Sequence, residues 1–91
     1  MKLKQKKRFL AKQILDFMKE HNYENRGFNE SDQFVLELRE MAEGKDRRFS
    51  KEMNWALYHV DIVADKELMN LFMQLSSVDR LAHYLRWIPW I

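Results

Sequence analysis

The chain contains no cysteine, a single proline and only two glycines in 91 residues. Without cysteine it forms no disulfide, no thiolate zinc site and no cysteine nucleophile. No apolar run approaches the roughly 20 residues that a membrane span needs. The apolar residues from Phe9 to Met18 are interrupted by Lys12 and Asp16, so they do not read as a secretory signal. We therefore expect a cytoplasmic protein, and a membrane partner is not expected.

Motifs for catalysis and metal binding are also missing. There is no phosphate-cradling glycine loop, no nucleophile elbow and no zinc-binding helix motif. The three histidines, His21, His59 and His83, fall on three different predicted helices and form no ligand set. A small bundle also has little room for a substrate pocket of ~300–1,000 Å³. We expect no enzyme activity, no cofactor, no metal and no small-molecule substrate.

The chain is instead rich in apolar residues at helical spacing, with 46% hydrophobic and 13% aromatic residues. Few glycines and prolines leave few breaks between regular elements. Apolar positions that repeat every 3.6 residues predict helices over about 3–21, 32–43, 51–64, 66–75 and 78–87. The fold class predicted is all-α: a compact bundle of four to five short helices in a single domain, residues 1–91.

Capping residues and breaks set the boundaries of these helices. Asn29, Ser31 or Asp32 is predicted to cap the second helix, and Gly44 to end it in a left-handed conformation. Ser50 is predicted to cap the third helix and Asp65 the fourth helix. Ser76 and Ser77 are predicted to break the chain before the fifth helix. In the fifth helix, Val78, Leu81, Ala82, Leu85 and Ile88 are predicted to face inward. Pro89 cannot continue a helix.

The predicted helix 51–64 is apolar on two sides. Met53 and Leu57 mark one side, and Trp55, Tyr58 and Ile62 mark the other. A helix of this kind is either central in the bundle or part of an interface. We prefer burial of Trp55, Tyr58 and Ile62 in the core, and keep a partner surface or a homodimer contact as the alternative.

The C-terminal segment 84–91 is the most apolar part of the chain and holds two of its three tryptophans. Tyr84, Arg86 and Trp87 are of the residue types that dominate binding energy at interfaces. Trp87 continues the fifth helix and is expected to pack on the bundle. Trp90 and Ile91 follow Pro89, in the apolar tail 88–91, and no helical stripe places them on the core. They are therefore candidate anchors for a partner.

The N-terminal residues 1–8 form a basic segment without any acid, although the net charge of the chain is only +2. The cations Lys4, Arg8 and Lys12 stack at i, i+4 and i+8, where like charges repel. They also stand at a helix N-terminus, where the macrodipole disfavours cations. This segment is either a frayed, solvated end or a site for a negatively charged partner. For a nucleic-acid partner the candidate residues are Lys2, Lys4, Lys6, Lys7, Arg8, Lys12, Arg47 and Arg48.

These features favour a non-enzymatic protein-binding module that acts as an inhibitor or adaptor of a larger protein. Its candidate binding residues are Trp55, Tyr58, Ile62, Tyr84, Arg86, Trp87, Trp90 and Ile91. The composition, rich in lysine, asparagine and methionine, is similar to that of small accessory proteins of phages and mobile elements. Self-association through the same residues is a close variant. The alternative is a nucleic-acid-binding regulator that uses the basic N-terminal segment.

Overall fold

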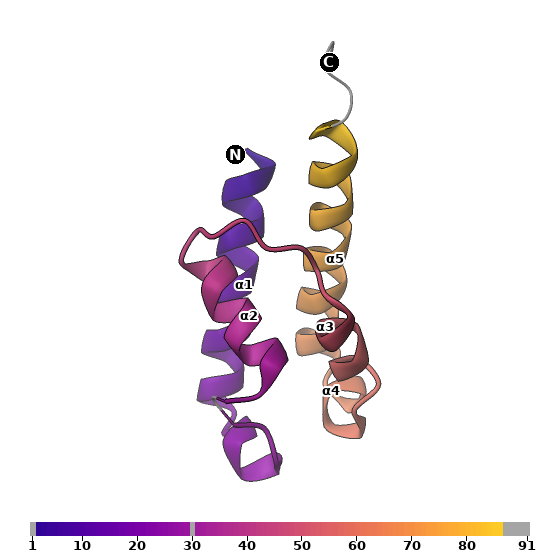
Figure 1. The fold of residues 1–91 in the computed structure, drawn as a ribbon. Coiled ribbons are helices and arrows are strands. Elements are labelled where there is room, and N and C mark those ends of the chain that lie inside the picture. The colour runs from indigo at the N-terminus through magenta and orange to yellow at the C-terminus, as the bar shows by residue number, and fades with distance from the viewer. Residues whose placement is uncertain (1, 30, 87–91) are drawn as a thin grey trace.

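The computed structural model describes residues 2–29 and 31–86. Its elements are α1 (Leu3–Glu20), the 3-10 helix η1 (Tyr23–Arg26), α2 (Gln33–Ala42), α3 (Lys51–Ala56), α4 (Val60–Ala64) and α5 (Lys66–Arg86) (Figure 1). The described residues contain no strand, and the predicted all-α class is confirmed.

The two long helices, α1 and α5, run antiparallel and side by side (Figure 1). The start of α1 therefore lies against the second half of α5. Helix α2 also packs on α1, so α1 is the central helix of the globule. The α2–α3 connection, residues 43–50, crosses from the end of α2 toward α5 (Figure 1).

The core follows from the helical spacing of the apolar residues. Leu10, Ile14 and Met18 of α1 are buried, as their shared stripe predicts. His21, at the end of the first predicted helix, is exposed and stacks on the Phe17 ring at 4.0 Å between centroids. The predicted stripe of α2 is buried at Phe34, Val35, Leu38 and Met41.

The predicted first loop contains the short helix η1, because two of its aromatic residues belong to the core. Tyr23 is 1% exposed and Phe28 is 7% exposed. The Tyr23 hydroxyl donates a hydrogen bond to Asp65 Oδ2 at 3.0 Å, which ties this loop to the start of α5. The chain turns sharply around them through left-handed backbone at Asn22 and Gly27.

The predicted capping positions are largely confirmed. Ser50 Oγ accepts a hydrogen bond from the Met53 N–H at 3.1 Å at the start of α3. Asp65 Oδ1 accepts one from the Leu68 N–H at 3.2 Å at the start of α5. Gly44 follows α2 with a φ of 94°, a left-handed conformation that favours glycine. Asp32 precedes α2, but its carboxylate accepts from the Asn29 N–H instead of from α2.

The single helix predicted over 51–64 is wrong, because the chain breaks into α3 and α4. His59 has extended backbone, and its Nδ1 accepts a hydrogen bond from the Asp61 N–H at 3.3 Å, which starts α4. The break changes the helical phase between Trp55 and Ile62, which one helix would place on a common side. Ile62 is fully buried, as expected, whereas the predicted burial of Trp55 and Tyr58 is wrong.

The predicted break at Ser76-Ser77 is also wrong, because α5 continues through both serines. Leu68, Phe72 and Leu75 are fully buried, and the same helical phase carries burial on to Val78 and Asp79. Leu81, predicted to face inward, is 48% exposed, while Ala82 and Leu85 are half-buried. The residues predicted for the tail, 88–91, lie outside the described part of the chain.

Candidate protein-binding surface

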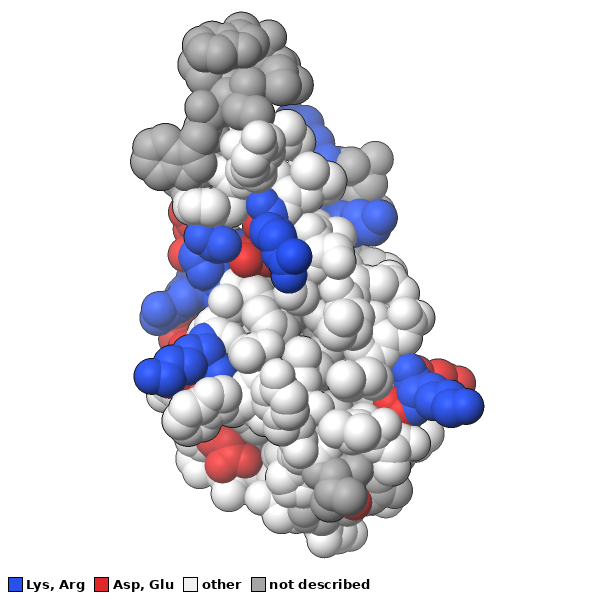
Figure 2. Space-filling model, turned by 90° about the vertical axis from the view of Figure 1, so that its right-hand side faces the viewer, with Lys and Arg blue, Asp and Glu red and all other residues white. Residues whose placement is uncertain are grey.

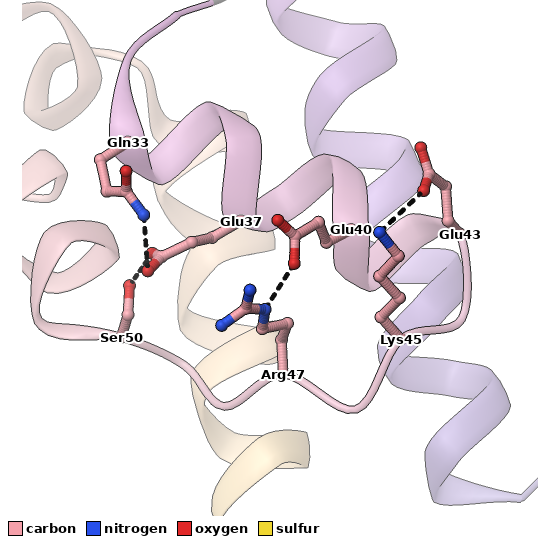
Figure 3. A network of polar contacts seen from close by, with 7 residues as sticks. All are labelled: Gln33, Glu37, Glu40, Glu43, Lys45, Arg47 and Ser50. Atoms are coloured by element: carbon pink, nitrogen blue, oxygen red, sulfur yellow. Dashed lines mark hydrogen bonds and ion pairs between the residues drawn. The ribbon is translucent and has the colours of Figure 1, made fainter.

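The α2–α3 connection is held along the acidic side of α2, and this fixes where α3 begins. Arg47 Nε donates a hydrogen bond to Glu40 Oε2 at 2.6 Å, and Lys45 Nζ lies 3.8 Å from Glu43 Oε2 (Figure 3). The hydroxyl of Ser50 donates to Glu37, while its oxygen also caps α3. Ser50 thus links α2 directly to the first turn of α3.

Helix α3 and the turn after it carry two strongly exposed aromatic residues. Trp55 is 66% exposed and Tyr58 is 78% exposed. Lys51 Nζ lies 5.5 Å from the centre of the Trp55 ring, close enough for a cation–π contact. On the other side of the turn, His59 packs edge-on against the buried Phe28 at 4.4 Å between centroids. Both aromatic residues are therefore presented from a supported segment.

Helix α5 adds a second set of exposed apolar residues on its outer side. Met73 is 52% exposed, Leu81 is 48% exposed and Tyr84 is 66% exposed. Met73 and Tyr84 are eleven positions apart in the sequence, about three helical turns, so they lie on the same face of α5. Val63 of α4 is also exposed. Of the large apolar residues exposed in the described part of the chain, only Phe9 and Leu36 lie on α1 and α2.

The side formed by α3, α4 and α5, here termed the uncharged side, carries few charges. Figure 2 shows this side: a broad uncharged area, with charged side chains gathered along its margins and toward one end. The sequence explains it, because residues 53–58 and 68–78 include no Lys, Arg, Asp or Glu. Depletion of charge together with exposed Trp, Tyr and Met is typical of the centre of a protein interface.

The structure exposes only part of the predicted binding set. Trp55 of α3, Tyr58 of the turn after it and Tyr84 of α5 are exposed, whereas Ile62 is fully buried and serves the core. Arg86 is the last residue of α5, and Trp87, Trp90 and Ile91 lie outside the described residues. The predicted binding set does not include Val63, Met73 or Leu81, which are exposed.

Two of the predicted nucleic-acid residues are instead part of a buried ionic cluster. Asp79 is 2% exposed, and Lys7, on the neighbouring turn of α1, is 8% exposed. Lys7 Nζ lies 2.7 Å from Asp79 Oδ1, and Arg48 Nε donates to Asp79 Oδ2 at 3.1 Å. The cluster joins α1, α5 and the α2–α3 connection. Its signal in the sequence was the place of Lys7 on the apolar stripe between Leu3 and Leu10.

The electrostatics of Asp79 reflect a balance of opposing effects. Burial raises the pKa of its carboxyl, but hydrogen bonds from Lys7, the Phe49 N–H and Arg48, with the positive charge of Lys7, lower it more. The net pKa lies below the ordinary value of 3.8. Asp79 is therefore an anion at neutral pH, which suits a structural ion cluster.

Two further cations of the predicted set are used within the fold. Arg8 Nε donates to the Ala42 carbonyl oxygen at 2.9 Å, where a cation also complements the C-terminal end of α2. Hydrogen bonding between Arg47 and Glu40 lowers the pKa of Glu40 and raises that of Arg47. The remaining candidates, Lys2, Lys4, Lys6 and Lys12, are exposed along α1 and its first flanking residue.

The fold nevertheless gathers cations from two distant parts of the sequence. A hollow of about 150 Å³ opens between the start of α1 and the end of α2. Its lining includes Lys4, Lys7 and Arg8 from α1, Lys45 from the α2–α3 connection and one acid, Asp46.

The described residues include no group of three or more His, Asp or Glu residues arranged to hold a metal ion. None of the helices described is both long and apolar enough to cross a membrane. No protein family, curated protein or solved structure matches this chain.

Proposed function

We propose that the chain is a non-enzymatic protein-binding module that acts as an inhibitor or adaptor of a larger protein, of the kind encoded by phages and mobile elements. The observation that carries the proposal is the exposure of Trp55, Tyr58 and Tyr84, each at least 66%, on the elements that form the uncharged side. Exposure of large aromatic side chains to water is unfavourable, and their burial against a partner is favourable.

The binding mechanism would be burial of these aromatic anchors within a rim of charged residues. Tryptophan and tyrosine supply large contact areas at a low cost in side-chain entropy. Lys51, whose Nζ lies 5.5 Å from the centre of the Trp55 ring, and Arg80, which precedes Leu81 in the sequence, are exposed and would stay at the solvated edge. Because Ser50, Glu37 and Phe28 support the segment around Trp55, the anchors would need little reordering on binding.

The proposal is tested by comparing wild-type protein with Trp55→Ser/Tyr58→Ser in affinity capture from the native host. Candidate partners are then purified and their binding measured directly by calorimetry. We expect the double variant to lose at least about tenfold in affinity, corresponding to ~1.4 kcal/mol or more. Leu36→Ser, an exposed apolar residue on α2, is the matched control and should bind like wild type. Equal binding of the double variant and wild type would refute this surface.

Nucleic-acid binding remains a second proposal, favoured by the hollow that Lys4, Arg8 and Lys45 line together. Internal partners for Lys7, Arg47 and Arg48 reduce the charge available to phosphates. Fluorescence anisotropy with duplex and single-stranded oligonucleotides at two salt concentrations tests it, because phosphate contacts give a clear salt dependence. Weak binding without that dependence would exclude this function.

A further inference from the structure

The outer face of α1 carries an ordered pattern of charge that neither the core nor the uncharged side uses. Lys2, at the cap position, and Lys6 stand at its beginning, and Asp16 and Glu20 stand near its end. All four side chains are exposed, and among the described residues none has a hydrogen bond or ion pair. Helical spacing places all four on one face of the helix, opposite the buried residues.

This pattern is unfavourable for α1 on its own. Lys2 and Lys6 repel each other, and so do Asp16 and Glu20, since each pair is four residues apart. The cations also stand at the positive end of the helix dipole, and Glu20 stands at the negative end. A second α1 in antiparallel orientation would relieve all of these repulsions, because its own charges and dipole run the opposite way.

The same face bears both a protruding ring and a hollow. Phe9 lies between the two charge pairs, closer to Lys6 than to Asp16, and is 51% exposed. Further along α1, a hollow of about 370 Å³ opens between α1 and the start of α5. Its lining is Gln13, Asp16, Phe17, Glu20, Glu67, Asn70 and Leu71. Phe17 and Leu71 give this hollow an apolar part that suits an aromatic side chain.

We propose that two copies of this chain associate through α1, antiparallel and related by a two-fold axis. With the axis at the level of Ala11, Lys2 faces Glu20 of the second copy and Lys6 faces Asp16 of the second copy. In this register Phe9 lies opposite Gln13 of the second copy and enters the hollow there. A two-fold contact makes every pair twice, so one register satisfies both ends of the stripe.

The size of the contact sets its strength. The 18 residues of α1 span about 27 Å, and one face of a single helix covers much less than the ~800 Å² per partner of a standard interface. The dimer is therefore weak, in roughly the micromolar range, and sensitive to salt. It leaves the uncharged side open in both copies, so it does not depend on the proposed function.

Sedimentation equilibrium over a range of concentrations tests the dimer, with two charge-reversal variants as the decisive samples. Lys2→Glu/Lys6→Glu makes the stripe wholly acidic, and Asp16→Lys/Glu20→Lys makes it wholly basic. Each variant alone should weaken dimerisation about tenfold or more, while an equimolar mixture should form heterodimers. Lys45→Glu/Lys51→Glu, the same charge change on exposed residues of other segments, should leave the dimer intact.

The apolar part of the contact is tested with one variant and one control variant. Phe9→Ser should weaken the dimer, while Leu36→Ser, an exposed residue on α2, should not. Circular dichroism of every variant checks that the helices are intact. The proposal is overturned if the protein stays monomeric at low salt up to about 1 mM, if the mixed variants do not associate, or if Trp55→Ser/Tyr58→Ser abolishes the dimer.

Discussion

A carboxylate as buried as that of Asp79 persists as an anion only because donors replace the water around it. Lys7 of α1 provides one of those donors, and Arg48 and the Phe49 N–H of the α2–α3 connection provide the others. Attraction and desolvation nearly offset each other in such a cluster, so its presence adds modest net stability. Removal of Asp79 is costly, because Lys7 then stays buried without its partner, whereas the half-exposed Arg48 remains solvated.

Asp79→Ala should therefore lower the free energy of unfolding by about 3 kcal/mol, since it leaves Lys7 without its closest partner. Chemical denaturation followed by circular dichroism measures the change. Asp16→Ala is the control, because Asp16 is exposed and has no ion pair in the described structure. A loss below about 1 kcal/mol for Asp79→Ala would show that the cluster is not buried as described.

The pH dependence of stability follows from the lowered pKa of Asp79. Because its pKa is lower in the folded than in the unfolded protein, its contribution is complete above the ordinary value of 3.8 and is lost as the pH falls below it. The difference in stability between wild type and Asp79→Asn should therefore be largest near neutral pH and shrink in acid below that value. Urea denaturation at a series of pH values measures it, and a constant difference would contradict the assignment.

Among the elements, α5 shows how tertiary packing overrides a local signal. Ser76 and Ser77 are residues that favour caps and turns, which supported a break between two short helices. The continuous burial of Phe72, Leu75 and Asp79 on α1 keeps the segment helical instead. Helix propensity differs little between serine and its neighbours, so a few core contacts decide the outcome.

The sign of the change in unfolding free energy on substitution of Ser77 distinguishes a continuous α5 from two separate helices. In the interior of a continuous helix, exposed Ser77→Ala should raise the free energy of unfolding by roughly 0.5 kcal/mol. If the serine capped a separate helix, the same change would lower it by about 1 kcal/mol. Thermal and urea denaturation resolve this difference, and Lys12→Ala, at an exposed position within α1, calibrates the measurement.

The α3–α4 segment marks the limit of what helical periodicity can predict. Ser50 and Asp65 were recognised as caps because such side chains bond to backbone N–H groups wherever a helix starts. The break before α4 depends on His59, whose ring packs on Phe28 from a distant loop. Histidine is a weak local signal, and that contact exists only in the folded chain.

At the scale of the molecule, the break between α3 and α4 places Ile62 in the core and leaves Trp55 on the surface. Ile62→Ala should lower the free energy of unfolding by about 2–4 kcal/mol, because the side chain is fully buried. Trp55→Ala, at a side chain that is 66% exposed, should change it by less than about 1 kcal/mol. Denaturation of both variants measures the contrast. Comparable losses would place Trp55 in the core, where the sequence pattern expected it.

The candidate surface could be predicted only in part, because the sequence does not show which apolar residues are buried in the core. Tyr84 was expected at an interface, and Trp55 and Tyr58 were identified as an alternative surface, because aromatic residues are conspicuous in any sequence. The outward position of Leu81 depends on the phase of an uninterrupted α5, which only packing establishes. Likewise, the sequence does not reveal that Lys7 and Arg48 both form ion pairs with Asp79, which makes them weaker candidates for phosphate contacts.

The cluster around Asp79 also bears on the order of folding events. It joins α1 to α5, elements that stand near opposite ends of the described chain, and it closes only when the α2–α3 connection lies across them. Bringing such distant segments together costs loop-closure entropy, whereas the neighbouring helices α1 and α2 meet early. Interactions that form after the main folding barrier act on the unfolding rate, so we expect Asp79→Ala to speed unfolding more than it slows folding. Loss of this carboxylate would then shorten the lifetime of the native state.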